Sequence, residues 1–217
     1  AELDINPLLV SSERIFALDA RVVLHDPKTP EDKLPHPAIR PYPNQYATPW
    51  KLKNKAPVTI RPIKPEDEPQ MVKFHETLSE ESVYNRYFTG LKLSQRVAHE
   101  RLTRICFNDY DREIALVAEL KAPKGEEKKI LGVGRLSKQH GRSEAEFAVL
   151  VNDAWHDQGL GTELLRRLIE IGRAEKLTRI TGQVLAENHA MHHICRKVGF
   201  QVVHDTDSNL FTASYTY

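Results

Sequence analysis

The chain has 217 residues, enough for one domain of ordinary size and a smaller appendage. Its 31 basic and 30 acidic residues nearly cancel, so the charge gives no reason to expect nucleic acid or an anionic membrane as the main partner. No apolar run is long enough to span a bilayer, and no signal peptide is recognised. Two cysteines, Cys106 and Cys195, fit neither a disulfide framework nor a zinc motif, so we expect a reducing, cytoplasmic location.

The first 56 residues are expected to form an appendage. Apolar runs at 8–10, 15–18 and 22–24 indicate two short strands within residues 1–25, with the turn-like Ser11–Arg14 after the first run. A hairpin this small is not stable alone in water. Residues 26–56 hold seven of the 13 prolines, a composition typical of a stiff, extended linker.

From Val58 onward, segments with strand and helix patterns alternate. Strands are expected at residues 58–63, 113–120, 130–136, 147–151, 179–185, 200–203 and 210–217. Helices are expected from residue 65, over 79–88, from residue 161 and over 188–198. This order predicts the α+β class, with helices packed on a mixed sheet.

The segment Trp155–Leu177 is the most informative part of the chain. A glycine-spaced turn, Gly159-Leu160-Gly161, leads into an amphipathic helix, and an apolar strand headed by Glu146 precedes it. Free backbone N–H groups and the positive end of the helix dipole meet at such a turn, and glycines let a phosphate approach closely. The pattern therefore predicts an anion site.

This turn has three possible interpretations. A dinucleotide fingerprint would need a third glycine where Leu164 stands and an acid at the end of the next strand, where none occurs before Glu187. That departure argues against a nicotinamide cofactor. A plain strand-to-helix turn fits the glycines as well, and a pyrophosphate site of another kind is the more specific alternative.

The helix after this turn is expected to be mainly structural. Its apolar residues should pack on the sheet: Leu164, Leu165, Leu168, Ile169 and Ile171. Its charged residues should face water: Glu163, Arg166, Arg167, Glu170 and Arg173.

Two motifs resemble the GNAT N-acetyltransferases. Residues 156–161, His-Asp-Gln-Gly-Leu-Gly, resemble the acetyl-CoA pyrophosphate loop (Q/R)-x-x-G-x-(G/A), with His156 in the Q/R position. Residues 188–200 resemble the family's N-x-x-A/M…K-x-G-F helix and turn. The resemblance covers Val58–Tyr217. It implies a mixed, mostly antiparallel sheet flanked by helices, with the N-terminal strands and linker as an appendage, and acetyl-CoA as co-substrate without a metal.

The same resemblance implies the residues that bind acetyl-CoA. The pyrophosphate is expected on the loop of His156, Asp157, Gln158, Gly159, Leu160, Gly161 and Thr162, chiefly through backbone N–H groups. A splayed strand end at Val149, Leu150 and Val151 is expected to pair with the pantetheine amides and to polarise the thioester carbonyl, although ordinary sheet core fits these residues too. Asn188 is expected to hydrogen-bond the pantetheine arm, and Gly199 to end its helix in a left-handed conformation.

Further segments resemble one branch of the family. Residues 60–68, 78–88 and 110–117 resemble the Pat-type bacterial protein lysine acetyltransferases, in many of which the GNAT domain follows a region similar to NDP-forming acyl-CoA synthetases. Asp4–Leu8 and Leu18–Arg21 resemble the end of the ATP-grasp part of that region. We therefore expect a trimmed tail at 1–25, a proline-rich linker at 26–56 and the GNAT domain at 57–217.

This branch implies that the acceptor is a protein lysine, with an AMP-forming acyl-CoA synthetase as the expected protein partner. Two alternatives stay open. One is an N-acetyltransferase of a small-molecule amine, and the other is a non-catalytic module that senses acetyl-CoA. Neither nucleic acid nor a membrane is expected as a partner.

Glu146 is the candidate general base. A lysine ammonium with a pKa of about 10.4 must lose a proton before it attacks a thioester, at a cost of about 4.6 kcal/mol at pH 7. A carboxylate can take that proton directly or through a water. The resemblance places the family's base at Glu146, and Glu144, two residues earlier on the same strand face, is the reserve candidate.

The general acid is less well defined. Many GNAT enzymes carry a tyrosine where this chain has Cys195. A thiol could protonate the departing CoA thiolate, but a cysteine on a helix is more often a small core residue, and that interpretation is preferred. His189 and His193 have i, i+4 spacing without the glutamate of H-E-x-x-H, so surface histidines are expected and no metal site.

Overall fold

The computed structural model describes residues 2–30, 33–34, 39–121, 127–206 and 208–217. Residues 31–32 and 35–38 of the expected linker lie outside this range. The chain divides into two compact units, Ala1–Ala38 and Ile39–Tyr217.

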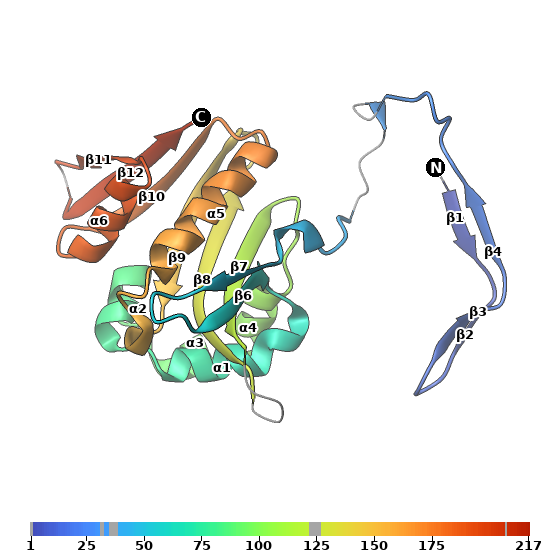
Figure 1. Ribbon diagram of the computed structural model, residues 1–217, viewed down its shortest axis with the longest axis horizontal. Helices are drawn as coiled ribbons and strands as arrows, with labels where there is room; N and C mark the ends of the chain where they lie inside the picture. The colour runs from blue at the N-terminus through green and yellow to red at the C-terminus, as the bar shows by residue number, and fades with distance from the viewer. Residues whose placement is uncertain (1, 31–32, 35–38, 122–126, 207) are drawn as a thin grey trace. The chain divides into compact units, whose positions relative to one another are not determined.

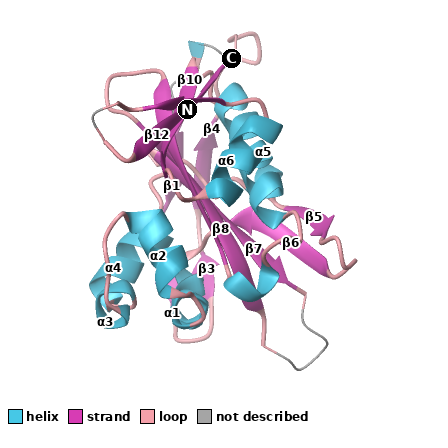
Figure 2. Cartoon of the chain, turned by 90° about the vertical axis from the view of Figure 1, so that its left-hand side faces the viewer, coloured by secondary structure: helices cyan, strands magenta, loops and turns pink. Residues whose placement is uncertain are grey.

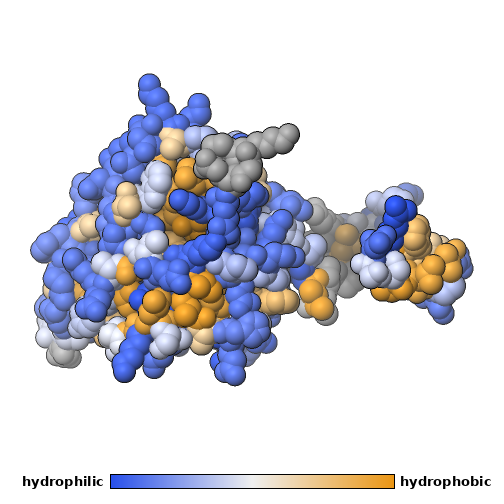
Figure 3. Space-filling view, turned by 90° about the horizontal axis from the view of Figure 1, so that it is seen from below, coloured by the Kyte–Doolittle hydropathy of each residue, from blue (hydrophilic) through white to orange (hydrophobic). Residues whose placement is uncertain are grey.

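The first unit is a narrow antiparallel ribbon (Figure 1). Strand β1 (Glu2–Ile5) pairs with β4 (Ala20–Val23), and β2 (Leu8–Val10) pairs with β3 (Ile15–Ala17). The sequence predicted two short strands from these apolar runs, whereas the structure has four. Strand β1 was not expected, although its acidic and apolar residues alternate as in a strand. Apolar side chains such as Leu9 and Phe16 are exposed, and orange surface is prominent on this unit in Figure 3.

The second unit is built on one eight-stranded sheet in the order β11-β12-β10-β9-β8-β7-β6-β5. Its strands are β5 (Thr48–Lys51), β6 (Pro57–Pro62), β7 (Glu113–Leu120), β8 (Lys129–Lys138), β9 (Glu144–Val151), β10 (Arg179–Leu185), β11 (Gln201–His204) and β12 (Leu210–Thr216). The β9–β10 pair is parallel and the other neighbours are antiparallel. The expected mixed, mostly antiparallel sheet flanked by helices is confirmed.

Helices cover both faces of this sheet (Figure 2). They are α1 (Glu68–Glu76), α2 (Glu80–Tyr87), α3 (Leu93–Arg96), α4 (His99–Cys106), α5 (Leu160–Ala174) and α6 (His189–Lys197). Helices α5 and α6 lie on one side, over a core that includes Leu116, Leu164 and Phe147. Helices α1, α2 and α4 lie on the other side, over a core that includes Met71, Leu102 and Val117.

Helices α3 and α4 were not expected from the sequence. Helix α3 is a single turn, and only Leu102 and Cys106 of α4 are buried. The three apolar residues of α4, Leu102, Ile105 and Cys106, have the i, i+3, i+4 spacing of an amphipathic helix, so the sequence carried a short signal that the prediction overlooked. Packing of α4 against α1 stabilises this helix of eight residues.

The expected linker ends earlier than residue 56. Strand β5 pairs with β6 through four residue pairs and forms one edge of the main sheet. Pro49 is tolerated in β5 because an edge strand does not need every N–H in the ladder. The prediction of an extended linker over 26–56 is therefore wrong for its last part, because the prolines hid an edge strand.

The stretch before β5 is anchored to the second unit as well. The Arg40 guanidinium lies 2.8 Å from the Glu175 carboxylate and 2.7 Å from that of Asp111. The Tyr42 hydroxyl donates to the Pro62 carbonyl at 2.7 Å. Residues 39–56 thus belong to the body that carries the sheet.

One face of α5 differs from the expectation. The five apolar residues of α5 named above are buried, as predicted. Glu163, however, is only 4% exposed and pairs with Arg166 and Arg167, and the Arg167 guanidinium donates to the Thr48 hydroxyl. The prediction that Glu163 and Arg167 face water is wrong, because the unexpected strand β5 covers that flank of the helix.

Candidate active site between two diverging strands

A gap opens between β9 and β10. The two strands pair only from Glu144–Glu146 to Arg179–Thr181. Beyond that point β9 stays on β8 while β10 continues on β12. The edge of β9 from Phe147 to Val151 therefore has no strand partner on the β10 side among the residues that the structure describes.

The ladder register decides which backbone groups face this gap. The N–H of Asn152 donates to the Leu131 carbonyl at 2.9 Å, just past the β8–β9 ladder. In an antiparallel pair, alternate residues bond to the neighbour and the residues between them point away. The backbone groups of Val149 and Val151 consequently face the gap. Those of Leu150, the third residue predicted here, point toward β8.

The chain leaves β9 through a short 3-10 turn, η4 (Asp153–Trp155), and reaches the N-terminus of α5. Gly159 has φ +81° and Asp157 has φ 58°, so the backbone bends twice through the left-handed region. The first intrahelical hydrogen bond of α5 runs from the Glu163 N–H to the Gly159 carbonyl, at 3.0 Å. The N–H groups of Leu160, Gly161 and Thr162 precede it and lack intrahelical acceptors, and no described side chain caps this end.

The two glycines of the loop serve different purposes. Gly159 is needed for its positive φ, because a Cβ there would meet only ordinary contacts. Gly161 is needed for space, since a Cβ would lie 3.1 Å from Cδ1 of Ile194 on α6. Together they bring the free N–H groups to the surface beside the gap, an arrangement suited to a phosphate.

His156 and Gln158 brace this loop from two sides. The His156 Nε2 lies 3.0 Å from the Val151 carbonyl, and with the proton on Nε2 the imidazole donates to it. The side-chain oxygen of Gln158 accepts from the Asn54 N–H at 3.1 Å, and its backbone carbonyl accepts from the Lys53 N–H at 3.2 Å. Both side chains therefore hold the loop in shape.

Lys53 and Trp50 were missed as neighbours of this loop. A Cβ built on Gly159 would lie 3.8 Å from Cε of Lys53 and 3.7 Å from the Trp50 ring. The sequence gives no signal for them, because both lie in the segment expected to be a linker. The β5–β6 hairpin brings the lysine, with its positive charge, alongside the N-terminus of α5.

Asn188 lies at the N-terminus of α6, near the far side of the gap. Its Oδ1 accepts from the Met191 N–H at 3.1 Å and so caps the helix. The side-chain NH₂ group has no hydrogen bond within the described residues. At the other end of α6, Gly199 has φ +97° and the Phe200 N–H donates to the Cys195 carbonyl at 2.9 Å, which confirms the left-handed helix end.

The two candidate bases differ in their surroundings. Glu144 is held by Arg179 at 2.8 Å. Glu146 is exposed and has no ion pair within the described part of the chain. It lies at the point where β9 and β10 separate, on the α2 side of the strand. Burial lowers the pKa of Arg86, and Tyr87 and Glu146 oppose this effect, so the Glu146 carboxylate lies within the electrostatic reach of Arg86.

Cys195 is a core residue. It is fully buried within the α5-side core, and burial raises the pKa of its thiol to about 12. A thiol without solvent access and with so high a pKa is a poor proton donor to a group in the gap. The geometry favours the packing interpretation.

Asp153 fixes α2 against the end of β9. Its carboxylate accepts from the Ser79 N–H at 3.0 Å, the Ser79 hydroxyl at 2.6 Å and the Ser82 hydroxyl at 2.9 Å. Although burial alone would raise the pKa of Asp153, these hydrogen bonds lower it. The residues of α2 are thereby held in a defined position beside β9.

In the described part of the chain, no group of three or more His, Cys, Asp or Glu side chains is arranged to hold a metal ion. Every helix there is too short or too polar to span a bilayer.

The class of this protein follows from a comparison of its sequence with known families. Residues 58–201 match the family model of the acetyltransferase (GNAT) domain, which is more than half of the chain. The chain belongs to the GNAT acetyltransferase family.

Known relatives agree with this assignment. Acetyltransferase PA5475 of Pseudomonas aeruginosa is 28% identical over 152 residues, or 70% of this chain and 79% of that protein. The GNAT domain of S. lividans PAT superposes with a TM-score of 0.71 at 22% identity, covering 82% of this chain and 100% of that one. The PaiA N-acetyltransferase from Thermoplasma acidophilum, in complex with coenzyme A, gives 0.58 at 18% identity, covering 74% and 99%. The two structural likenesses show the fold.

Proposed function

We propose that this protein transfers the acetyl group of acetyl-CoA to the ε-amine of a protein lysine, with Glu146 as general base. The observation that carries the proposal is the gap between β9 and β10, which joins a set of free N–H groups at one end to a carboxylate at the other. A thioester carrier laid along this gap would have its phosphates at α5 and its acyl group near Glu146.

The chain offers a partner for each part of acetyl-CoA. The N–H groups of Leu160, Gly161 and Thr162 would bind the pyrophosphate, and the positive end of α5 favours the same charge. The backbone of Val149 and Val151 would pair with the pantetheine amides in the manner of an added strand. His156, Asp157, Gln158 and Gly159 would shape the loop, and the free NH₂ group of Asn188 would donate to the pantetheine arm.

The chemical step follows from these positions. Glu146, directly or through a water, takes a proton from the lysine ammonium, and the neutral amine attacks the thioester carbonyl carbon, so a C–N bond forms and the C–S bond breaks. The second proton on nitrogen passes to water or to the departing sulfur, and CoA leaves as the thiolate or the thiol. A backbone N–H at the gap would polarise the carbonyl as charge develops on its oxygen.

Two observations favour a protein lysine as acceptor. Residues 60–68, 78–88 and 110–117 resemble the Pat-type enzymes, and the fold is like that of the GNAT domain of S. lividans PAT. An acyl-CoA synthetase of the AMP-forming type is the protein partner we propose. The likeness of residues 1–25 to the end of an ATP-grasp region stays a prediction, and no activity is assigned to that unit.

The base is tested by Glu146→Gln, with Glu144→Gln as the matched control on the same strand face. We expect Glu146→Gln to lower kcat about 100- to 10,000-fold, since that is the usual contribution of general base catalysis. The Kd for acetyl-CoA should change little. Full turnover by Glu146→Gln would refute the assignment, and a comparable collapse in Glu144→Gln alone would transfer the role to Glu144.

The acceptor is tested by incubating the full chain with acetyl-CoA and either an acyl-CoA synthetase, polyamines or free amino acids. We expect acetylated lysines on the synthetase, detected by mass spectrometry. Transfer only to small amines would identify a small-molecule N-acetyltransferase. Acetyl-CoA binding without transfer to any acceptor would identify a sensing module.

A further inference from the structure

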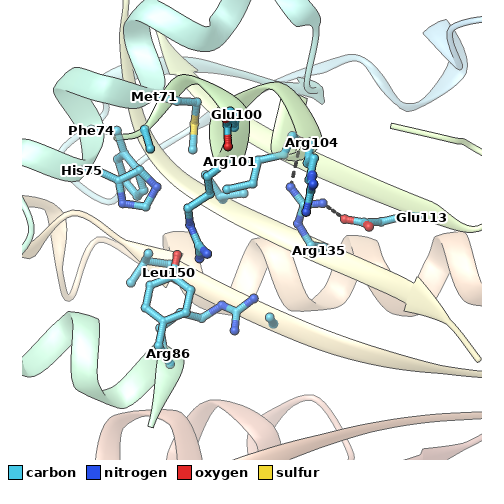
Figure 4. A pocket seen from close by; sticks show the side chains of 15 residues that line it. Met71, Phe74, His75, Arg86, Glu100, Arg101, Arg104, Glu113, Arg135 and Leu150 are labelled. Atoms are coloured by element: carbon cyan, nitrogen blue, oxygen red, sulfur yellow. Dashed lines mark hydrogen bonds and ion pairs between the residues drawn. The ribbon is translucent and has the colours of Figure 1, made fainter. Parts of the chain in front are cut away.

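A second cavity lies on the opposite face of β9 from α5. Its volume is about 470 Å³, and its lining includes Val133, Ala148 and Leu150 from the sheet. Figure 4 shows the cavity from close by, with Leu150 labelled. Side chains on a strand alternate between faces, so Ala148 and Leu150 share the face of Glu146. The cavity therefore adjoins the proposed base on the side of α1, α2 and α4, where an acceptor can reach it without crossing the acetyl-CoA gap.

The walls of this cavity carry an excess of positive charge. Arg86 comes from α2, Arg101 and Arg104 from α4, and Arg135 from β8. Arg135 is paired with Glu113 and donates to a backbone carbonyl at 2.9 Å. Within the described ranges, the other three guanidinium groups have no carboxylate within ion-pair distance.

Two of these arginines converge on one aromatic ring. The guanidinium carbons of Arg86 and Arg101 lie 5.0 and 5.2 Å from the centroid of the Tyr87 ring. Figure 4 shows both side chains directed into the same space, with Arg135 beside them. Burial lowers the pKa of Arg135 to about 10, and the charge of Arg86 acts in the same direction. Like charges held together in this way favour an anion between them.

His75 adds an independent sign of a ligand. It lines the cavity, is 1% exposed, and neither of its ring nitrogens has a hydrogen-bond partner among the described residues. The buried Nε of Arg101 lacks one as well. Buried polar atoms are normally satisfied, so each exception calls for an explanation. A bound group with acceptor oxygens would satisfy the Nε–H of Arg101 and the single ring N–H that a neutral His75 carries.

We infer that this cavity binds a carboxylate carried by the acceptor next to its amine, most directly an aspartate or glutamate side chain beside the target lysine. This inference rests on the proposed function, since it places the acceptor on the α2 side of Glu146. Planar guanidinium groups bind carboxylates through paired hydrogen bonds, and Arg86 and Arg101 stand unpaired for that purpose. Asp153, through Ser79 and Ser82, holds the N-terminus of α2, the helix that carries Arg86.

The test compares peptides that differ in one charge. A lysine peptide with glutamate beside the lysine should be acetylated with a kcat/KM about tenfold or more above that of its glutamine twin, because one charged hydrogen-bonded contact corresponds to about that factor. Arg86→Gln and Arg101→Gln should each remove most of the preference. Arg142→Gln, at an exposed arginine outside the cavity, should keep it.

A binding experiment separates failure of this inference from failure of the proposed function. Both peptides are made with norleucine in place of lysine, and their affinity for the chain with bound CoA is measured by calorimetry. Tighter binding of the glutamate peptide, lost in Arg86→Gln, supports the cavity even if no peptide is acetylated. Equal affinities and equal rates for the twins, together with equal rates for free lysine and lysine methyl ester, would overturn it. A preference for free lysine over lysine methyl ester, without any peptide preference, would support the carboxylate site and assign it to a small acceptor.

Discussion

Protonation of His75 should control the acid stability of the second unit. This side chain on α1 is 1% exposed and its ring packs edge-on against Phe74, with centroids 5.7 Å apart. Burial lowers its pKa from 6.5 to about 4, and the charges of nearby arginines act in the same direction. The folded protein therefore keeps this imidazole neutral at pH values where the unfolded chain protonates it.

The sign and size of the effect follow from this difference. Between pH 6.5 and about 4 the unfolded state binds more protons at this residue, so the free energy of unfolding falls as the pH falls. Above pH 6.5 both states are neutral there and the effect disappears. A lowering of the pKa from 6.5 to about 4 corresponds to about 3 kcal/mol, at 1.36 kcal/mol for each tenfold change.

The assay is urea unfolding at several pH values between 7.5 and 4, in an amine buffer free of carboxylate and phosphate. His75→Leu has a similar volume and no titrating group. Between pH 7.5 and 4 its free energy of unfolding should therefore fall by about 3 kcal/mol less than that of the wild-type protein. Near pH 7 it should be at least as stable, because two unpaired polar nitrogens are removed. His140→Gln, at an exposed histidine, is the control and should follow wild type. Parallel pH profiles for wild type and His75→Leu would refute the reasoning.

Three further predictions concern packing, charge and backbone conformation, each measured as a change in the free energy of unfolding. Gly182→Ala should cost about 1–3 kcal/mol, because its Cβ would lie 2.4 Å from the Phe147 ring; no loss would mean that the ring has room to move. Glu163→Gln should cost about 1–3 kcal/mol by leaving the charge of Arg167, 12% exposed, without its partner, and a neutral result would contradict this. Lys176→Gly should gain up to about 1 kcal/mol, because this residue has φ 56°; destabilisation would argue that the lysine side chain makes a contact of its own.

The sequence predicted best where one strong local pattern determines the element. The bounds of β7 and β10 agree with the expected strands, because β7 contains the apolar run Ile114–Ala118 and β10 carries the β-branched residues Ile180, Thr181 and Val184. Helix α5 was recognised from its apolar spacing and its glycine turn. In each case the local preference and the tertiary environment favour the same structure.

The sequence predicted poorly where distant segments meet. Strand β5 was not expected because it contains Pro49 and follows a proline-rich stretch, and Lys53 was therefore not expected as a neighbour of the loop. The burial of Glu163 depends on that same strand. The cavity beside Glu146 joins arginines from α2, α4 and β8, and no spacing in one chain indicates that they face one another.

Because β5 pairs with β6, the folded domain begins before the first residue of the family match. The family match begins at residue 58, yet Lys53 and Asn54 donate their N–H groups to Gln158 in the loop at the start of α5. A chain shortened to begin at residue 57 would release this brace and turn β6 into an open sheet edge, a common starting point for aggregation. We therefore expect the smallest stably folded unit around the GNAT domain to begin near residue 39, because its first strand braces the loop at the start of α5.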